Sequence, residues 1–232
     1  MGDSLSEERF VVFDLDGTLV DTSRDLTDAL NRALASLDLP ALSRERVVAF
    51  VGDGSRKLVD RAVAAVGGPP DMASLVAERF LADYAANVLV ATAPYPGIEA
   101  ALDRLGAQGE VHLCLYSNKP GRHVRELLEG LGWAERFEVV MGGDWGGPRK
   151  PAPDGLQHVC NLLGLPCSAG VMVGDGTTDQ EAGRAAGLAR VAVTWGYRSE
   201  EQLAGLGPDR ICRNPNGLAD LVLELLGLGG KS

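Results

Sequence analysis

The sequence predicts an α/β protein: a doubly wound parallel sheet with a small all-helical cap domain inserted into it. After residue 94, short continuous apolar runs alternate with helical segments, which is typical of parallel strands covered on both faces by helices. Between the first apolar run and residue 94, apolar positions recur only at helical spacing. The chain therefore predicts a Rossmann-like core that helices interrupt early.

The first strand is predicted over residues 9–14, and the helical insert follows it. In the insert, Leu26, Leu30 and Leu34 share one face of a first amphipathic helix. The same spacing predicts further helices over residues 43–51, 56–66 and 72–89. Since no strand separates these helices, they form one unit joined to the sheet by two linkers. The predicted domains are a discontinuous catalytic core, residues 1–20 and 94–232, and a helical cap, residues 21–93.

The core continues as helices and strands in alternation. Strands are predicted over residues 111–116, 138–141, 170–174, 190–194 and 210–212. Helices are predicted over residues 98–107, 121–131, 154–163, 179–186 and 218–226, with a short one near residue 200. Open sheets of this kind bind ligands at the carboxyl ends of their strands. Polar residues that follow a strand are therefore the candidates for function.

Composition restricts the possible partners and location. The chain has 232 residues, and its 22 basic and 32 acidic residues give a formal net charge of 22 − 32 = −10, which argues against nucleic acid or an anionic membrane as partner. The four cysteines show neither CxxC nor metal-ligand spacing and are expected to be reduced and mostly buried. The N-terminal residues lack the basic and apolar regions of a secretory signal. We therefore expect a cytoplasmic protein without a membrane segment.

Two carboxylates end the first strand. Asp14 and Asp16 are two residues apart, so in extended backbone their side chains point the same way. Gly17 then allows a sharp turn, and Thr18 can tie that turn together. One carboxylate of such a pair can act as a nucleophile while the other transfers a proton. An Asp-Gly turn alone would explain the same residues, so the motif gains meaning only from its partners.

Neutral and basic donors follow two later strands. Ser117 and Asn118 offer a hydroxyl, an amide and backbone N–H groups to an oxyanion at the start of a helix. Lys150 precedes Pro151, whose ring fixes the local backbone and can hold the lysine toward the sheet edge. Taken singly, these segments are equally typical of a helix cap and a surface turn.

A second acidic pair follows a later strand. Asp175 ends that strand, and Asp179 lies four residues on, where it either caps the next helix or supports a metal site. With Asp14 and Asp16 these acids sum to −4, and Lys150 brings the charge to −3, which would repel an anionic substrate. One Mg²⁺ raises the sum to −1, and a proton on Asp16 raises it to 0. We therefore expect Mg²⁺, which prefers carboxylate oxygens.

Taken in order, these segments resemble the four motifs of the haloacid dehalogenase superfamily of phosphotransferases. The matching segments are Asp14-Leu15-Asp16-Gly17-Thr18-Leu19-Val20-Asp21-Thr22, Ser117-Asn118, Lys150-Pro151 and Gly174-Asp175-Gly176-Thr177-Thr178-Asp179. The resemblance covers nearly the whole chain. Residues 25–34, 50–54, 94–97 and 117–120 are similar to the phosphoglycolate phosphatase branch in particular.

The resemblance implies a role for each acid of the site. Asp14 would attack phosphorus and become an aspartyl phosphate. Asp16 would protonate the leaving alcohol and later activate water. Mg²⁺ would be held by the Asp14 and Asp175 carboxylates and by the backbone carbonyl of Asp16.

The resemblance also implies how the remaining residues act. Ser117, Asn118 and Lys150 would bind the transferring phosphoryl group, where positioning and electrostatics supply most of the acceleration. Asp179 would support the metal ligands or Lys150. Thr18 would support them from the first turn.

Other reactions of the same superfamily stay open as alternatives: pyrophosphate or sugar-phosphate hydrolysis, a sugar-phosphate mutase and a phosphonate hydrolase. Phosphonate cleavage requires a Schiff-base lysine from the cap, and Lys57, the cap's single lysine, is better explained as a solvated helix residue. A mutase of this type carries another acid where this chain has Gly174, and a histidine in the early linker, whereas the first histidine here is His112. Both differences favour a hydrolase.

Two further alternatives differ in chemistry. A phospho-accepting signalling domain also combines acids, a hydroxyl and a lysine at strand ends, but it is compact and has no inserted cap. A haloacid dehalogenase proper works without a metal. Turnover number separates the enzyme from the signalling domain, and a chelator separates the phosphatase from the dehalogenase.

The substrate implied by the resemblance and by the small cap is a small anionic phosphate ester, with 2-phosphoglycolate first. In capped members of the superfamily, the cap closes over the core and contacts the leaving group. Arg56, next to the turn at residues 52–54, is the candidate for binding a substrate carboxylate, although an exposed helix position also explains it. The oligomeric state is not indicated by these residues.

Overall fold

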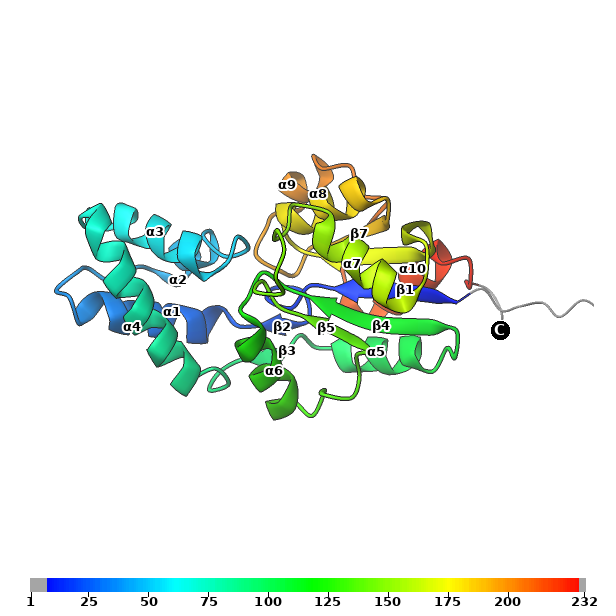
Figure 1. Cartoon of the computed structure of the whole chain (residues 1–232), viewed down its shortest axis with the longest axis horizontal. Coiled ribbons are helices and arrows are strands. Elements are labelled where there is room, and N and C mark those ends of the chain that lie inside the picture. Colours follow the sequence, from blue (N-terminus) through cyan, green and yellow to red (C-terminus); the bar gives the residue numbers. More distant parts are fainter. Residues whose placement is uncertain (1–7, 230–232) are drawn as a thin grey trace, which may run out of the picture.

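The computed structural model describes residues 8–229. The N-terminal segment that bears on a secretory signal lies largely outside this range. The described chain has two parts, a sheet covered by helices and, beside it, a group of helices from the first half of the sequence (Figure 1).

The core contains one parallel sheet. Within residues 8–229 it has six strands in the order β5-β4-β1-β6-β7-β8, and each neighbouring pair is parallel. The strands are β1 (Arg9–Phe13), β4 (Val111–Tyr116), β5 (Val139–Met141), β6 (Gly170–Gly174), β7 (Ala189–Val193) and β8 (Arg210–Cys212). Since the chain runs outward from β1 first through β4 and later through β6, the strand order reverses at β1, where such sheets bind ligands. The predicted doubly wound parallel sheet is confirmed.

Helices cover both faces of the sheet, as the apolar strands require. Alternate residues of β1 point to opposite sides, so Val11 and Phe13 join one hydrophobic cluster while Phe10 and Val12 join another. The first face is covered by α5 (Ile98–Gly106), α6 (Gly121–Gly130) and α10 (Leu218–Leu225). The second is covered by α7 (Asp154–Leu163) and α8 (Thr177–Ala186). A short helix, α9 (Glu200–Ala204), precedes β8.

The inserted helices have a hydrophobic core of their own. They are α1 (Ser23–Ala35), α2 (Arg44–Val48), α3 (Ser55–Ala65) and α4 (Ala73–Ala86). Leu30, Leu34, Val59 and Phe80 are fully or almost fully buried between them. Burying side chains of this size contributes about 1.5–3 kcal/mol each. The predicted all-helical cap is therefore present, drawn in blue to teal beside the sheet in Figure 1.

Two chain segments connect the cap to the core, and they bind each other. β2 (Val20–Asp21) and β3 (Ala93–Pro94) pair as antiparallel strands. Asp25, buried at the start of α1, accepts hydrogen bonds from the backbone N–H groups of Val90, Ala91 and Thr92 at 2.8–3.1 Å. The predicted cap limits, residues 21 and 93, fall inside this two-stranded sheet.

The structure differs from the sequence-based expectations in local details. α8 begins at Thr177, two residues before the predicted start, and its first turn is closed by Asp179 Oδ2, which accepts from the Gly176 N–H at 2.9 Å. Cys160 and Cys167 form a disulfide, so the prediction of reduced cysteines is wrong for this pair. Buried Cys114 and Cys212 are free thiols. No helix between residues 8 and 229 combines the length and apolar character that crossing a bilayer requires.

Candidate active site

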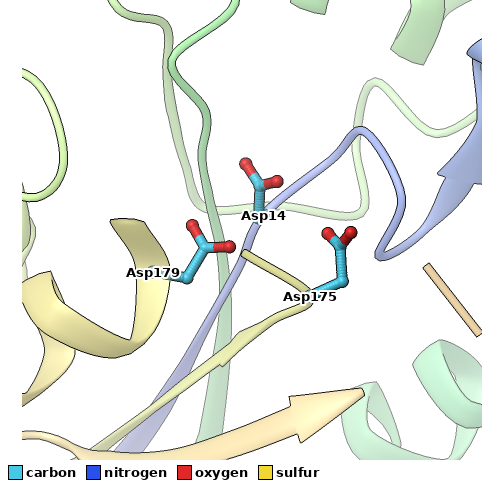
Figure 2. A group of neighbouring side chains, drawn as sticks. All are labelled: Asp14, Asp175 and Asp179. Atoms are coloured by element: carbon cyan, nitrogen blue, oxygen red, sulfur yellow. The ribbon is translucent and has the colours of Figure 1, made fainter. Parts of the chain in front are cut away.

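Three carboxylates meet at the carboxyl edge of the sheet. Asp14 follows β1 and Asp175 follows β6, and the two strands are parallel neighbours with Phe13 opposite Val173. Asp179 comes from the first turn of α8. Figure 2 shows the three side chains directed toward one space, and one oxygen of each carboxylate lies within 4.8 Å of the others. Two acidic motifs 161 residues apart, counted from Asp14 to Asp175, thus form one group because their strands are adjacent.

Close contacts fix the Asp175 carboxylate. The Thr18 hydroxyl donates to Oδ1 at 3.0 Å, and the backbone N–H of Tyr197 donates to Oδ2 at 2.7 Å. Gly17 permits this arrangement, because its φ is +85° and a Cβ there would lie 2.4 Å from Asp175 Oδ2. The glycine predicted as a turn residue therefore also provides the space that the carboxylate occupies.

Lys150 connects the two acidic motifs. Its Nζ donates to Asp14 Oδ1 at 2.8 Å, to Asp179 Oδ1 at 2.6 Å and to the Tyr116 carbonyl oxygen at 2.8 Å. The side chain is 1% exposed, and the peptide bond to Pro151 is cis. Because an ammonium has three donors, these contacts fix its position completely.

Burial changes the protonation of these groups. Burial raises the pKa of Asp14 to about 6; Lys150 opposes this rise, and the Asp179 charge adds to it. Burial also raises the pKa of Asp175 to about 7, and the charges of Asp179 and Asp14 act in the same direction. Burial alone would lower the pKa of Lys150, but the Asp14 and Asp179 charges raise it above its usual range. At Asp14 the effect of burial therefore outweighs that of the Lys150 charge, whereas Lys150 itself stays protonated.

Asp16 has a partner that the sequence analysis missed. Its carboxylate oxygens lie 2.7 and 2.9 Å from Lys119 Nζ, and its Oδ1 also accepts from the Thr22 hydroxyl at 2.6 Å. Lys119 is buried and lies directly after the second motif. That position was the available signal, but a lysine at a helix start is usually exposed. Burial alone would lower the pKa of Lys119, whereas the Asp16 charge raises it above its usual range.

The acidic group fits a divalent cation. Asp14, Asp175 and Asp179 offer carboxylate oxygens, the ligand type that Mg²⁺ prefers. With Asp16 the acids sum to −4, and Lys150 and Lys119 bring the formal charge to −2. One divalent cation therefore brings the site to 0. The sum of −3 derived from the sequence omitted Lys119.

Ser117 and Asn118 lie buried at the end of β4. The Ser117 hydroxyl oxygen accepts from the Lys119 N–H at 3.3 Å. The Asn118 amide donates to the carbonyl oxygens of Gly52 at 2.8 Å and Lys150 at 2.9 Å, while its Oδ1 has no partner among residues 8–229. Asn118 therefore connects the cap loop at Gly52 to the core.

Arg56 lies away from the other predicted site residues. Its side chain is 58% exposed and contacts Asp60 at 3.0 Å and Ser74 at 3.2 Å, both in the cap. Arg56 is not among the residues that line the cavity between the core and the cap. The structure thus brings together Asp14, Asp16, Asp175, Asp179 and Lys150, with Ser117, Asn118 and Thr18 adjacent, but it does not bring Arg56 to them.

A cavity of about 50 Å³ lies between the core and the cap beside Asp14 and Asp16. On the core side it is lined by Ser117, Asn118, Lys119 and His123. The cap contributes mainly carbon surface, from residues such as Leu26, Leu58 and Phe80, together with Tyr84. A space of this size holds about four water-sized groups.

Comparison with known proteins gives consistent matches. The family model for haloacid dehalogenase-like hydrolases matches residues 11–193. The phosphoglycolate phosphatase of Rhodospirillum rubrum is 44% identical, across 85% of this chain and 83% of that protein, and that of Salmonella typhimurium is 37% identical, across 97% and 95%. The crystal structure of a predicted phosphoglycolate phosphatase from Haemophilus somnus superposes with a TM-score of 0.87 at 30% identity, covering 94% of this chain and 99% of the other.

Proposed function

The chain belongs to the haloacid dehalogenase-like hydrolase family, and from this premise we propose a Mg²⁺-dependent phosphatase that hydrolyses a small phosphate monoester, 2-phosphoglycolate first. The observation that carries the proposal is Lys150, whose ammonium contacts Asp14 and Asp179 beside Asp175. A carboxylate nucleophile, a cation for phosphoryl oxygens and metal-binding acids are the parts that phosphoryl transfer requires. The similar phosphoglycolate phosphatases support the choice of substrate.

Asp14 is the nucleophile in this proposal. Lys150 occupies its Oδ1, so Oδ2 is the attacking oxygen. The bond from Oδ2 to phosphorus forms while the ester P–O bond breaks, which gives an aspartyl phosphate and the leaving alkoxide. Protonated Lys150 offsets charge on the phosphoryl oxygens, and Ser117 and Asn118 complete the phosphoryl site at the end of β4.

Asp16 transfers the protons. It lines the cavity beside Asp14, and the Thr22 hydroxyl orients its carboxylate. Asp16 enters the reaction protonated, gives this proton to the leaving oxygen and, now ionised, takes one from the water that attacks the aspartyl phosphate. The second step releases phosphate and restores Asp14.

We assign the Mg²⁺ ligands to the Asp14 and Asp175 carboxylates and the backbone carbonyl of Asp16. When bound, the ion neutralises charge on the acids and on the phosphoryl oxygens. The raised pKa values of Asp14 and Asp175 support this assignment, because burial and neighbouring acids disfavour the charge of both carboxyls and a bound cation would offset that. Asp179 holds Lys150, and Thr18 holds Asp175.

The alternatives are weaker on specific grounds. The cap wall of the cavity is mainly carbon surface, which favours a leaving group with fewer hydroxyls than a sugar. Lys57, the candidate Schiff-base lysine of a phosphonate hydrolase, is 62% exposed and paired with Asp53. The family match argues against a phospho-accepting signalling domain. Pyrophosphate stays a candidate substrate, and the cytoplasmic location stays a prediction.

Phosphate release from a panel of esters tests the proposal. The panel contains 2-phosphoglycolate, pyrophosphate, glucose 6-phosphate and 2-hydroxyethyl phosphate, each with Mg²⁺ and with a chelator. We expect many turnovers per chain, the highest kcat/KM on 2-phosphoglycolate and no activity in chelator. Release of one phosphate per chain would indicate a signalling domain instead, and activity that survives chelation would contradict the Mg²⁺ requirement.

A further inference from the structure

Lys119 is a buried cation to which the proposed reaction assigns no role. Its side chain is 5% exposed, and its Nζ contacts both carboxylate oxygens of Asp16. Lys150 already serves the phosphoryl side, through its contacts with Asp14 and Asp179. Lys119 lines the cavity as a buried ammonium separate from the one on the phosphoryl side, so we expect the ligand to carry a second anionic group there.

The cavity around Lys119 offers little other positive charge. Among the described residues that line it, Lys119 is the single lysine or arginine. His123, which also lines it, has its Nδ1 engaged by Glu126 at 3.0 Å. An anion surrounded by carbon atoms requires a paired cation to offset the loss of water. Lys119 is placed to be that cation.

Tyr84 provides an independent indication of the same kind. Its hydroxyl is buried in the cap wall of the cavity and makes no hydrogen bond of acceptable geometry with the described residues. The centroid of its ring lies 4.8 Å from Lys119 Nζ. A buried hydroxyl without a partner is costly, and it is expected where a ligand supplies the acceptor. The ammonium and the hydroxyl therefore belong to neighbouring side chains that line the same cavity.

The distances fit a short leaving group. In the proposed reaction the ester oxygen lies at Asp16, and one CH₂ group separates this oxygen from the carboxylate of 2-phosphoglycolate. Lys119 Nζ lies 2.7 Å from Asp16 Oδ1, in a cavity of about 50 Å³. A carboxylate that is one CH₂ group away from the ester oxygen can therefore reach the Lys119 ammonium.

We propose that Lys119 from the core and Tyr84 from the cap form the subsite that binds the carboxylate of the leaving group. This inference rests on the proposed function and specifies what selects its substrate. The substrate carboxylate replaces Asp16 as the partner of Lys119, which leaves Asp16 free to carry the proton that it gives to the ester oxygen. When a monoester without a carboxylate binds, Lys119 stays paired with Asp16.

The test compares 2-phosphoglycolate with 2-hydroxyethyl phosphate, in which CH₂OH replaces the carboxylate. Lys119→Met removes the ammonium and keeps a side chain of similar length. We expect the ratio of kcat/KM for the two esters, carboxylated over neutral, to fall about 100-fold. The ratio cancels any effect on Asp16 that both esters share. Lys57→Met, in a cap lysine that is 62% exposed, is the matched control and should keep the wild-type ratio.

Tyr84→Phe tests the subsite even if Lys119→Met does not fold. It removes one hydroxyl that makes no hydrogen bond of acceptable geometry within the described part of the chain, so the melting temperature should be unchanged or higher. The same ratio of kcat/KM should fall about 10-fold, the scale of one hydrogen bond to a charged group.

The failures of the two proposals are distinguishable. In the first case the wild-type chain hydrolyses both esters. If Tyr84→Phe then keeps the wild-type ratio of kcat/KM, the subsite is overturned while the phosphatase stands, whether or not Lys119→Met folds. If the wild-type chain prefers the neutral ester, the subsite is overturned as well. If it releases phosphate from neither ester, the proposed function fails, and the subsite fails with it.

Discussion

The carboxyl edge of the sheet and the cavity beneath the cap meet at Asp14 and Asp16, yet they are built differently. At the sheet edge the polar groups bind one another: Lys150 has three hydrogen-bond partners, and each Asp175 oxygen has a donor. In the cavity the cap wall is mainly carbon, and the Tyr84 hydroxyl makes no hydrogen bond of acceptable geometry with residues 8–229. The contrast agrees with the two proposals, in which the reaction depends on the strand ends and the choice of substrate depends on the interface between core and cap.

Replacement of the proposed nucleophile tests the sheet edge and should have the largest effect. In Asp14→Asn the amide cannot form the aspartyl phosphate, so kcat should fall by at least about 10⁴-fold on every ester. Phosphate release measures the loss, and circular dichroism checks that the fold is intact. Asp220→Asn, at a side chain that is 64% exposed and paired with Arg104, should keep full activity. Activity of Asp14→Asn within tenfold of wild type would remove Asp14 as the nucleophile.

The dependence of protein stability on pH and on Mg²⁺ tests the same edge of the sheet. The pKa values of Asp14 and Asp175 in the folded chain, about 6 and about 7, lie above the ordinary 3.8. A raised carboxyl pKa favours the folded state while the group is protonated, so this contribution is present at low pH and is lost as the pH rises through 6 and 7. In chelator, these two groups should lower the free energy of unfolding by on the order of 4 kcal/mol between pH 5 and pH 8.

Mg²⁺ should reverse this loss, because it binds the ionised carboxylates. The stabilisation by Mg²⁺, measured as the difference between urea unfolding curves with and without the ion, should be smallest at pH 5 and largest at pH 8. Asp175→Asn should remove most of this pH dependence, whereas Asp209→Asn, 46% exposed at its side chain, should preserve it. A Mg²⁺ effect that is equal at pH 5 and pH 8 would contradict a metal site at these acids.

Asp25→Ala tests the connection between the two regions. The carboxylate accepts from three consecutive backbone N–H groups of the second linker, and its loss leaves them without a partner at a buried position. We expect the free energy of unfolding to fall by about 3 kcal/mol. Asp28→Ala, one turn later on the exposed side of α1, should change it by less than about 0.5 kcal/mol. Equal losses in the two variants would mean that the linker does not depend on Asp25.

The sheet edge was predictable because a simple rule places its residues. Asp14, Ser117 and Asp175 each follow an apolar run that forms a buried strand, and parallel strands end at one edge regardless of their separation in the chain. Lys150 required the resemblance between motifs, because it follows β5 by a loop of several residues. The periodicity of the apolar residues was sufficient for the helices of both domains.

The cavity was less predictable because its contacts join side chains from different elements. Lys119 was visible beside the second motif, but its partner Asp16 is 103 residues away. Tyr84 follows the helical spacing of its neighbours, so the sequence alone gives it a place in the cap core. Asp25 resembles an ordinary acid in the first turn of a helix. Side-chain pairs of this kind depend on how the cap packs on the core, which periodicity does not determine.

Arg56→Ala should have the smallest effect on activity. It tests whether the exposed surface of the cap, and not only the interface between core and cap, contributes to substrate binding. The sequence predicted that Arg56 faces the substrate carboxylate, but its guanidinium contacts Asp60 and Ser74 on the cap surface. We therefore expect KM for 2-phosphoglycolate and for 2-hydroxyethyl phosphate to change less than about twofold, and the free energy of unfolding by less than about 0.5 kcal/mol. Steady-state kinetics of Arg56→Ala and Lys119→Met under the same conditions measures the difference between the two positions. A rise in KM above tenfold for 2-phosphoglycolate alone would assign carboxylate binding to the cap surface, because the neutral ester reports any general damage to the site.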